Sequence, residues 1–211
     1  MIINRVVRKG EKNVAIYFDN DEKLILSEDT FYNSGLRKGD EVSEDRYSFF
    51  IEQNILYHIK QRALAFLSRR FHSEKELFLK LKAKSYDERL IKIVLNELKS
   101  KSFIDDRNFT KLYMEEKLNG KIWGINKIRS ALFIKGISAS IIDEILIEFD
   151  NKKNNYELVN ELAGNKIEKL KKRNLDDKEI YQKTVSFLIS RGFDYEIAKE
   201  VCNKLINLDS D

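Results

Sequence analysis

The sequence contains no proline and only eight glycines. Because these two residues most often interrupt helices, their scarcity favours long helices and counts against a turn-rich sandwich or barrel. The single cysteine, Cys202, cannot form an intramolecular disulfide, so nothing in the chain requires an oxidising compartment. His58 and His72 have no cysteine or carboxylate at ligand spacing, and no glycine-rich phosphate loop is present. We therefore expect no metal, no nucleotide and no other cofactor.

Membrane and export signals are also missing from the sequence. No apolar run approaches the roughly 20 residues that span a bilayer, and residues 1–9 lack a charged region followed by an apolar one. With 42% hydrophobic and 35% charged residues, the chain can build a core and still cover it with exposed helices. We expect a cytoplasmic, monomeric protein without a membrane partner. Since no set of residues is arranged for catalysis, we expect no enzyme.

The positive charge is concentrated in one segment. The whole chain has a net charge of +4, but residues 54–104 contain 12 Lys and Arg against 5 Asp and Glu. Such a patch can contact phosphates or an acidic groove on a protein. A solvated helix face explains the same charge, and on charge alone this simpler interpretation is the better one.

The first fifty residues have a β-rich pattern. Two short runs, residues 14–18 and 23–26, are separated by the turn residues 19–22, which predicts a hairpin. Residues 2–7 suggest a further strand, and Ser27 can cap a short helix. A sheet this small is marginal alone and needs support from the helices that follow.

From Ser43 onward the apolar residues recur with helical spacing. Ser43 starts a helix followed by two acidic residues, Ser73 and Glu76 form a capping box, and Asp87 caps the next helix. Three longer helices, beginning near Asn54, Asp106 and Asn155, each open a unit of three helices.

The helical part of the chain repeats itself. A shift of 51 residues places Leu77 on Ile128 and Ser85 on Gly136, and a further shift of 56 places Gly136 on Gly192. In each copy a helix ends at the small residue, an apolar residue follows, and Ser or Asp caps the next helix.

One such unit buries little core alone, so stacking is expected. The predicted fold is mainly α: three tandem three-helix repeats in an elongated curved array, with a small β-rich N-terminal extension. The expected domains are an N-terminal β-hairpin extension and three repeats, at residues 1–50, 54–104, 105–150 and 151–211.

Four stretches resemble the RecX family of regulatory proteins. The order and spacing of the stretches carry the resemblance, which covers residues 54–208; the β-rich extension is similar to that of the longer members. Two departures are Ser85, where a glycine is usual, and Phe71-His72 in place of a more polar pair. The stretches are residues 62–77, 103–109, 123–138 and 190–194.

The resemblance implies a modulator of a RecA-type recombinase. RecX-like proteins bind in the groove of the recombinase filament on single-stranded DNA and restrain its growth, ATP hydrolysis and strand exchange, and so modulate DNA repair and the SOS response. The alternative is a direct nucleic-acid-binding helical module, because three-helix units resemble helix-turn-helix domains.

Three cations share one position in the repeats. Lys84, Lys135 and Arg191 directly precede the small residue that ends a helix. They can form a basic row facing DNA or an acidic recombinase surface. Stabilisation of the helix dipole, by about 0.3–1 kcal/mol each, explains all three without a partner and is slightly favoured.

Further candidates lie on the first and second repeats. Arg69 and Arg70 end a helix and point in different directions, so one of them can fork onto phosphate or carboxylate. Lys127 and Arg129 lie beside Trp123, which we interpret as a core or hinge residue rather than a base-stacking platform.

Two other features have a simpler interpretation as structure. Asp105-Asp106 caps the helix that contains Phe109, and Cys202 is a core residue rather than a nucleophile. The basic cluster at residues 169–173 is interpreted as a solvated face, with phosphate contact as the alternative.

Overall fold

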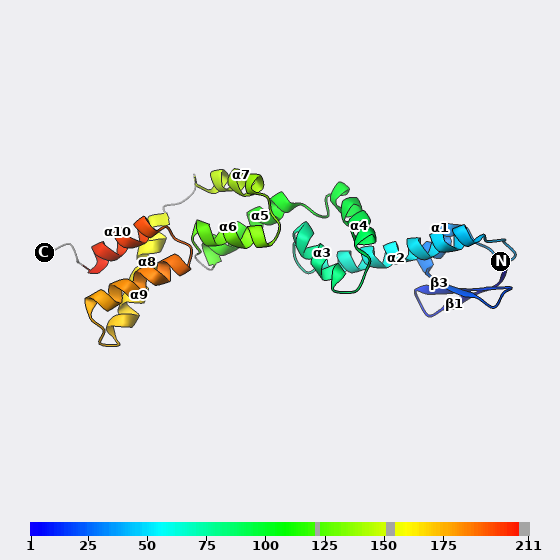
Figure 1. The fold of residues 1–211 in the computed structure, drawn as a ribbon, viewed down its shortest axis with the longest axis horizontal. Coiled ribbons are helices and arrows are strands. Elements are labelled where there is room, and N and C mark those ends of the chain that lie inside the picture. The colour runs from blue at the N-terminus through cyan, green and yellow to red at the C-terminus, as the bar shows by residue number, and fades with distance from the viewer. Residues whose placement is uncertain (121–122, 151–154, 207–211) are drawn as a thin grey trace. The chain divides into compact units, whose positions relative to one another are not determined.

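The computed structural model describes residues 1–120, 123–150 and 155–206. The chain divides into two compact units, Met1–Ile104 and Asp105–Asp211 (Figure 1). No helix in the described part of the chain is long and apolar enough to cross a membrane.

An antiparallel three-stranded sheet opens the first unit. Its strands β1 (Ile3–Lys9), β2 (Asn13–Phe18) and β3 (Lys23–Ser27) are paired in the order β1-β2-β3. The hairpin and the further strand expected from the sequence are both confirmed. One face of the sheet is buried through Ile16 and Leu26, which pack with Phe50 in a common core.

The short helix α1 (Glu28–Ser34) and the long helix α2 (Glu44–Leu67) cover this sheet. Ser27 caps α1 as expected, because its side chain accepts a hydrogen bond from the Thr30 amide. Asn54, in the middle of α2, accepts from the Ser27 amide at 2.7 Å and donates to the Ile25 carbonyl at 3.2 Å. These two bonds fix α2 to the end of β3 and supply the support that a small sheet needs.

The helix expected to begin near Asn54 in fact begins at Glu44, after the Ser43 cap. It runs unbroken to Leu67 because it has buried residues on both sides of Asn54. Phe50 packs against the sheet, and Ile59 packs in the core of the first repeat. The division between extension and first repeat, placed at residues 50–54 from the sequence, therefore falls inside one helix.

The second half of α2 packs with α3 (Glu74–Lys82) and α4 (Glu88–Ser100) around a common core. Ser73 caps α3 by accepting from the Glu76 amide, and Asp87 caps α4 by accepting from the Arg89 and Leu90 amides, as expected. The core includes the fully buried Leu77, Leu81 and Leu98.

The second unit contains two further sets of three helices. The expected helix starts at Asp106 and Asn155 are confirmed. In the described residues the first set also includes a π-helical segment, η1, directly after α5. The elements are α5 (Asp106–Glu115), η1 (Glu116–Gly120), α6 (Ile125–Ile134), α7 (Ala139–Asp150), α8 (Asn155–Lys171), α9 (Asp177–Ser190) and α10 (Tyr195–Ile206).

The repeated turn has the geometry that the sequence predicts. Ser85, Gly136 and Gly192 all have positive φ angles, 62°, 85° and 89°. The amide of the apolar residue that follows each glycine bonds back into the helix, from Ile137 to Leu132 and from Phe193 to Leu188. The mainly α class with three-helix repeats and a small N-terminal sheet is thus confirmed.

Candidate partner-binding surface

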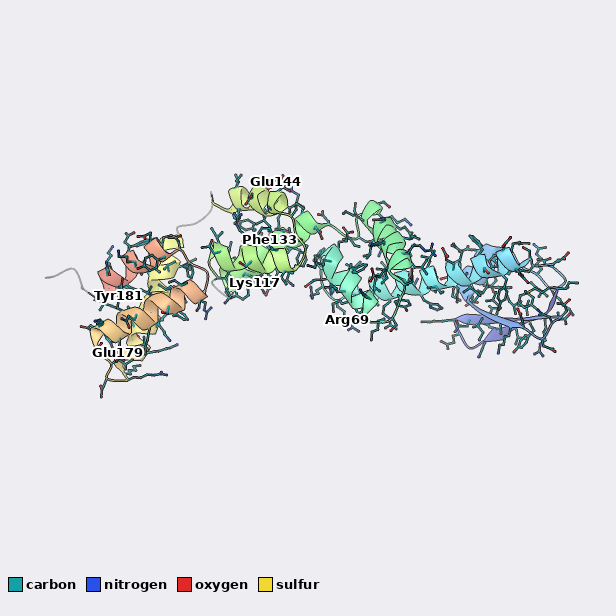
Figure 2. All side chains as sticks on the ribbon, viewed as in Figure 1. Arg69, Lys117, Phe133, Glu144, Glu179 and Tyr181 are labelled. Atoms are coloured by element: carbon teal, nitrogen blue, oxygen red, sulfur yellow. The ribbon has the colours of Figure 1, made fainter. Side chains whose placement is uncertain are left out.

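Among the candidate cations of the first repeat, Arg69 and Lys84 are exposed and have no ion pair with a described carboxylate. Arg69 lies just after the end of α2 (Figure 2). Lys84 lies just after the end of α3. Arg70 is different, because its guanidinium bonds to the Phe71 carbonyl at 2.7 Å and to Glu76 at 2.9 Å. Of the adjacent arginines, Arg69 is therefore the one available to a partner.

Lys135 and Arg191 cover aromatic rings. The Lys135 amino group lies 5.3 Å from the centroid of Tyr113, and the Arg191 guanidinium lies 5.1 Å from that of Phe187. Both residues are half-buried and are the C-cap residues of α6 and α9. These contacts agree with the helix-end interpretation, since cation–π packing and the dipole both stabilise a cation here.

Trp123 is half-buried in the core of the second repeat, between two lysines. The Lys127 amino group lies 4.7 Å from its ring centroid and that of Lys117 lies 5.5 Å away. The interpretation of Trp123 as a core residue agrees with this position.

Lys117 was not among the residues expected from the sequence. It is 7% exposed, belongs to η1, pairs with Glu116 and lies 4.8 Å from the Tyr113 ring centroid. Its amino group needs these partners because burial of an unpaired ammonium is costly. Sequence periodicity gives no signal for it, because a π-helical segment changes the direction of every side chain that follows.

Arg129 is held by an ion pair. Its guanidinium lies 2.7 Å from the Asp143 carboxylate, which links α6 to α7. Lys127 donates from its amino group to the Ser190 carbonyl at 3.0 Å, so Lys127 and Arg191 meet where the second and third repeats touch. Both second-repeat candidates thus have partners within their own unit.

The basic cluster at the end of α8 is exposed. Lys169, Lys171, Lys172 and Arg173 all lie on the surface, and Leu170 between them is buried. This pattern agrees with the solvated face expected from the sequence and leaves the charges open to an anionic partner.

Several apolar side chains are exposed in the same repeats as the candidate cations. In the first repeat Phe71 is 55% and Leu79 52% exposed, and in the second Ile134 is 76% and Ile147 68% exposed. Leu79, Ile134 and Ile147 belong to apolar-rich helices, so the sequence did not separate them from the core, and Phe71 lies in the connection between α2 and α3.

The remaining expectations concern catalysis and metals. Asp105 caps α5 through the Arg107 and Asn108 amides, as expected. Cys202 is buried in the third repeat, and burial raises the pKa of its thiol to about 11. In residues 1–120, 123–150 and 155–206 no group of three or more histidine, cysteine or carboxylate side chains is placed to hold a metal ion.

Three family models match the chain in order. They are described as the first, second and third three-helix domains of RecX, and they match residues 60–98, 105–146 and 154–202. The "Regulatory protein RecX" of Clostridium acetobutylicum is 34% identical over 203 residues, which cover 95% of this chain and 93% of the relative. That of Clostridioides difficile is 34% identical over 202 residues, which cover 96% and 93%.

Two solved structures have the same fold. "Crystal structure of regulatory protein RecX" matches with a TM-score of 0.74 and 24% identity over 98% of both chains. "Crystal structure of RecX from Lactobacillus salivarius" matches with a TM-score of 0.62 and 24% identity over 74% of this chain and 99% of that one.

Proposed function

The chain belongs to the RecX family of regulatory proteins, and from this membership we propose that it binds the filament of a RecA-type recombinase on single-stranded DNA. Binding restrains ATP hydrolysis, filament extension and strand exchange, and in this way modulates DNA repair and the SOS response. The observation that carries the proposal is the succession of three RecX three-helix domains in one chain. Regulation here rests on binding by a monomer; no catalytic step and no cofactor is assigned to the chain.

Tandem repeats suit a polymeric partner. A filament presents the same surface at regular intervals, and a chain of similar units can contact several of these surfaces at once. Weak contacts on one chain add up because the first raises the effective concentration of the next. A regulator of this kind acts on many recombinase subunits at substoichiometric amounts.

Among the candidate residues of the first repeat, Arg69 and Lys84 are the ones that the geometry leaves open to a partner, whereas Arg70 is paired with Glu76. Both are exposed, and no described carboxylate pairs with either. Exposed apolar residues, Phe71 and Leu79, accompany them in the same repeat. Exposed cations and exposed apolar side chains in one repeat suit an acidic protein groove, since charge steers association and apolar area adds affinity.

The direct test is the DNA-dependent ATPase of the cognate recombinase with substoichiometric protein. We expect inhibition well below one regulator per recombinase subunit. Tight binding to bare DNA without inhibition at low ratio would refute the proposal.

The contact residues are tested by the double reversal Arg69→Glu with Lys84→Glu. The concentration that gives half-inhibition should rise about tenfold or more, because each reversal replaces attraction by repulsion. The matched control is Lys9→Glu with Lys12→Glu, which changes the net charge equally at two exposed lysines of the extension. Equal effects of the two double variants would assign the result to net charge rather than to a surface on the first repeat.

Direct nucleic-acid binding is the second candidate, and the exposed cluster at residues 169–173 favours it. Phosphate contacts make binding fall steeply with salt. If reversal of the cluster abolishes binding to bare single-stranded DNA but leaves filament inhibition unchanged, nucleic-acid contact is a separate property of the third repeat.

A further inference from the structure

Helix α6 begins without a side chain to cap it. Its N-cap is Gly124, which makes no side-chain cap bond, whereas Ser73 caps α3 and Asp176 caps α9 in the other repeats. Gly124 is nevertheless buried. The first amides of a helix have no partner within it, so a buried helix start needs acceptors from elsewhere.

The missing acceptors come from the end of α9 in the third repeat. The Gly124 amide donates to the Arg191 carbonyl at 2.8 Å, and the Asn126 amide donates to the Gly192 carbonyl at 3.2 Å. The Lys127 amino group donates to the Ser190 carbonyl at 3.0 Å. Three successive carbonyls at the end of one helix thus meet donors at the start of another. We call this contact the inter-repeat cap.

Only glycine fits at two positions of this cap. A Cβ atom on Gly124 would lie 2.2 Å from the Gly192 carbonyl carbon and oxygen. A Cβ atom on Gly192 would lie 2.3 Å from the Lys127 Cβ and 2.4 Å from its backbone nitrogen. Both obstacles include backbone atoms, so no side-chain rotation can relieve them. The close approach itself therefore accounts for Gly124, where the backbone angle is ordinary.

Electrostatics favours the same arrangement. The end of α9 has partial negative charge and the start of α6 partial positive charge, so carbonyls of one meet amides of the other. Lys127 adds a full positive charge beside the α9 end. Lys127 and Arg191, two of the candidate partner-binding residues from the sequence, thereby take part in holding the repeats together.

We propose that Gly124, Gly192 and Lys127 are positioning residues that fix the third repeat to the second, so that both engage the filament as one rigid body. The proposal rests on filament binding as the function of the chain. A rigid pair loses less conformational freedom on binding than two repeats that move independently. Loosening the cap at Gly124 or Gly192 should therefore weaken inhibition without removing any candidate contact residue.

The variant Gly124→Ser distinguishes a local cap on α6 from the contact between the second and third repeats. The serine hydroxyl can cap α6 locally, as Ser73 caps α3, while its Cβ atom excludes the α9 end. We expect a folded protein in which the Asn126 amide exchanges with solvent roughly tenfold faster or more. The half-inhibitory concentration in the recombinase ATPase assay should rise about tenfold or more.

Gly192→Ala tests the opposite side of the contact, with Gly39→Ala as its control. Gly39 has nearly the same backbone angle, a φ of 92° against 89°, but open space around the added methyl group. Gly192→Ala should speed exchange at Asn126 and weaken inhibition, and Gly39→Ala should do neither. Lys127→Met adds no clash and serves if a glycine variant does not fold; it should change both readouts in the same direction by a smaller factor.

Hydrogen exchange at Asn126 and inhibition of the recombinase ATPase distinguish the ways in which the proposal can fail. Unchanged Asn126 exchange in Gly192→Ala and Lys127→Met would refute the inter-repeat cap, and faster exchange with wild-type inhibition would refute its role in positioning. If the wild-type protein does not inhibit the recombinase, the proposed function fails, and hydrogen exchange still decides whether the cap exists.

Discussion

Replacing Ser85 by glycine should stabilise the first unit. Ser85 ends α3 with a φ of 62°, in the left-handed region, where Gly136 and Gly192 stand in the other repeats. The serine is exposed, so its side chain contributes little packing that glycine would lose. The substitution therefore alters the free energy of unfolding mainly through the backbone conformation at the end of a helix.

The expected gain follows from two opposing effects. A non-glycine residue in the left-handed region costs about 1–2 kcal/mol. Glycine, in turn, loses about 0.5–1 kcal/mol more conformational entropy on folding than other residues. The difference leaves a net gain of about 0.5–1 kcal/mol for Ser85→Gly. For a cooperative unit of about 100 residues, this raises the melting temperature by about 3–6 °C.

Thermal or urea unfolding of the full chain measures the change, with two variants for comparison. Ser48→Gly, at an exposed position inside α2, should lower stability by about 0.5 kcal/mol, which shows that glycine itself is not stabilising. Gly136→Ser should destabilise the second unit by at least about 0.5 kcal/mol. If Ser85→Gly is neutral or destabilising while Ser48→Gly behaves as expected, the argument from the left-handed conformation is wrong.

Other predictions concern ionisable groups. Burial raises the pKa of Cys202 to about 11, so at pH 8 about one thiol in a thousand is ionised. A thiol reagent should therefore react with Cys202 only after unfolding, and fast reaction with the native protein would contradict this. Burial lowers the pKa of His72 below 6.5, so the unfolded chain binds more protons and stability falls as the pH drops below about 6.5; the melting temperature of His72→Gln should fall less between pH 7 and 5.5. Lys101 and Lys60, each 2.6 Å from Glu97, hold the pKa of that carboxyl below its usual value. Glu97→Gln should therefore cost about 0.5 kcal/mol at pH 7, and the difference should shrink as the pH falls below 4.5, the usual pKa of a glutamate.

Local features of the fold were predictable from the sequence. Ser27, Ser73, Asp87 and Asp105 cap the helices that they were expected to cap. A cap depends on a side chain and an amide two or three residues away, so the sequence contains the whole interaction. The left-handed turns at the ends of α3, α6 and α9 were predictable for the same reason, because each depends on residues close together in the sequence.

Features that depend on distant residues were not predictable. No sequence pattern indicates that the Gly124 amide donates to the carbonyl of Arg191 in the next repeat. Likewise, α2 packs against the sheet through Phe50, before Asn54, and against the first repeat through Ile59, after it. Periodicity alone therefore suggested a new helix near Asn54. Burial of Lys117 depends on a π-helical segment that no sequence pattern indicated.

The three cations at the ends of α3, α6 and α9 show why equivalent positions need not have equivalent roles. Arg191 lies over Phe187 of its own helix, and Lys135 lies over Tyr113 of the preceding helix. In the first repeat Arg62 stands at the position that matches Tyr113, and Lys80 stands at the one that matches Phe187, so neither position supplies a ring for Lys84. Lys84 therefore stays exposed, and within residues 1–104 no carboxylate pairs with it. The backbone position is shared by all three cations, but the aromatic neighbours decide which is held within the fold, and by this argument Lys84 is the one left for a partner.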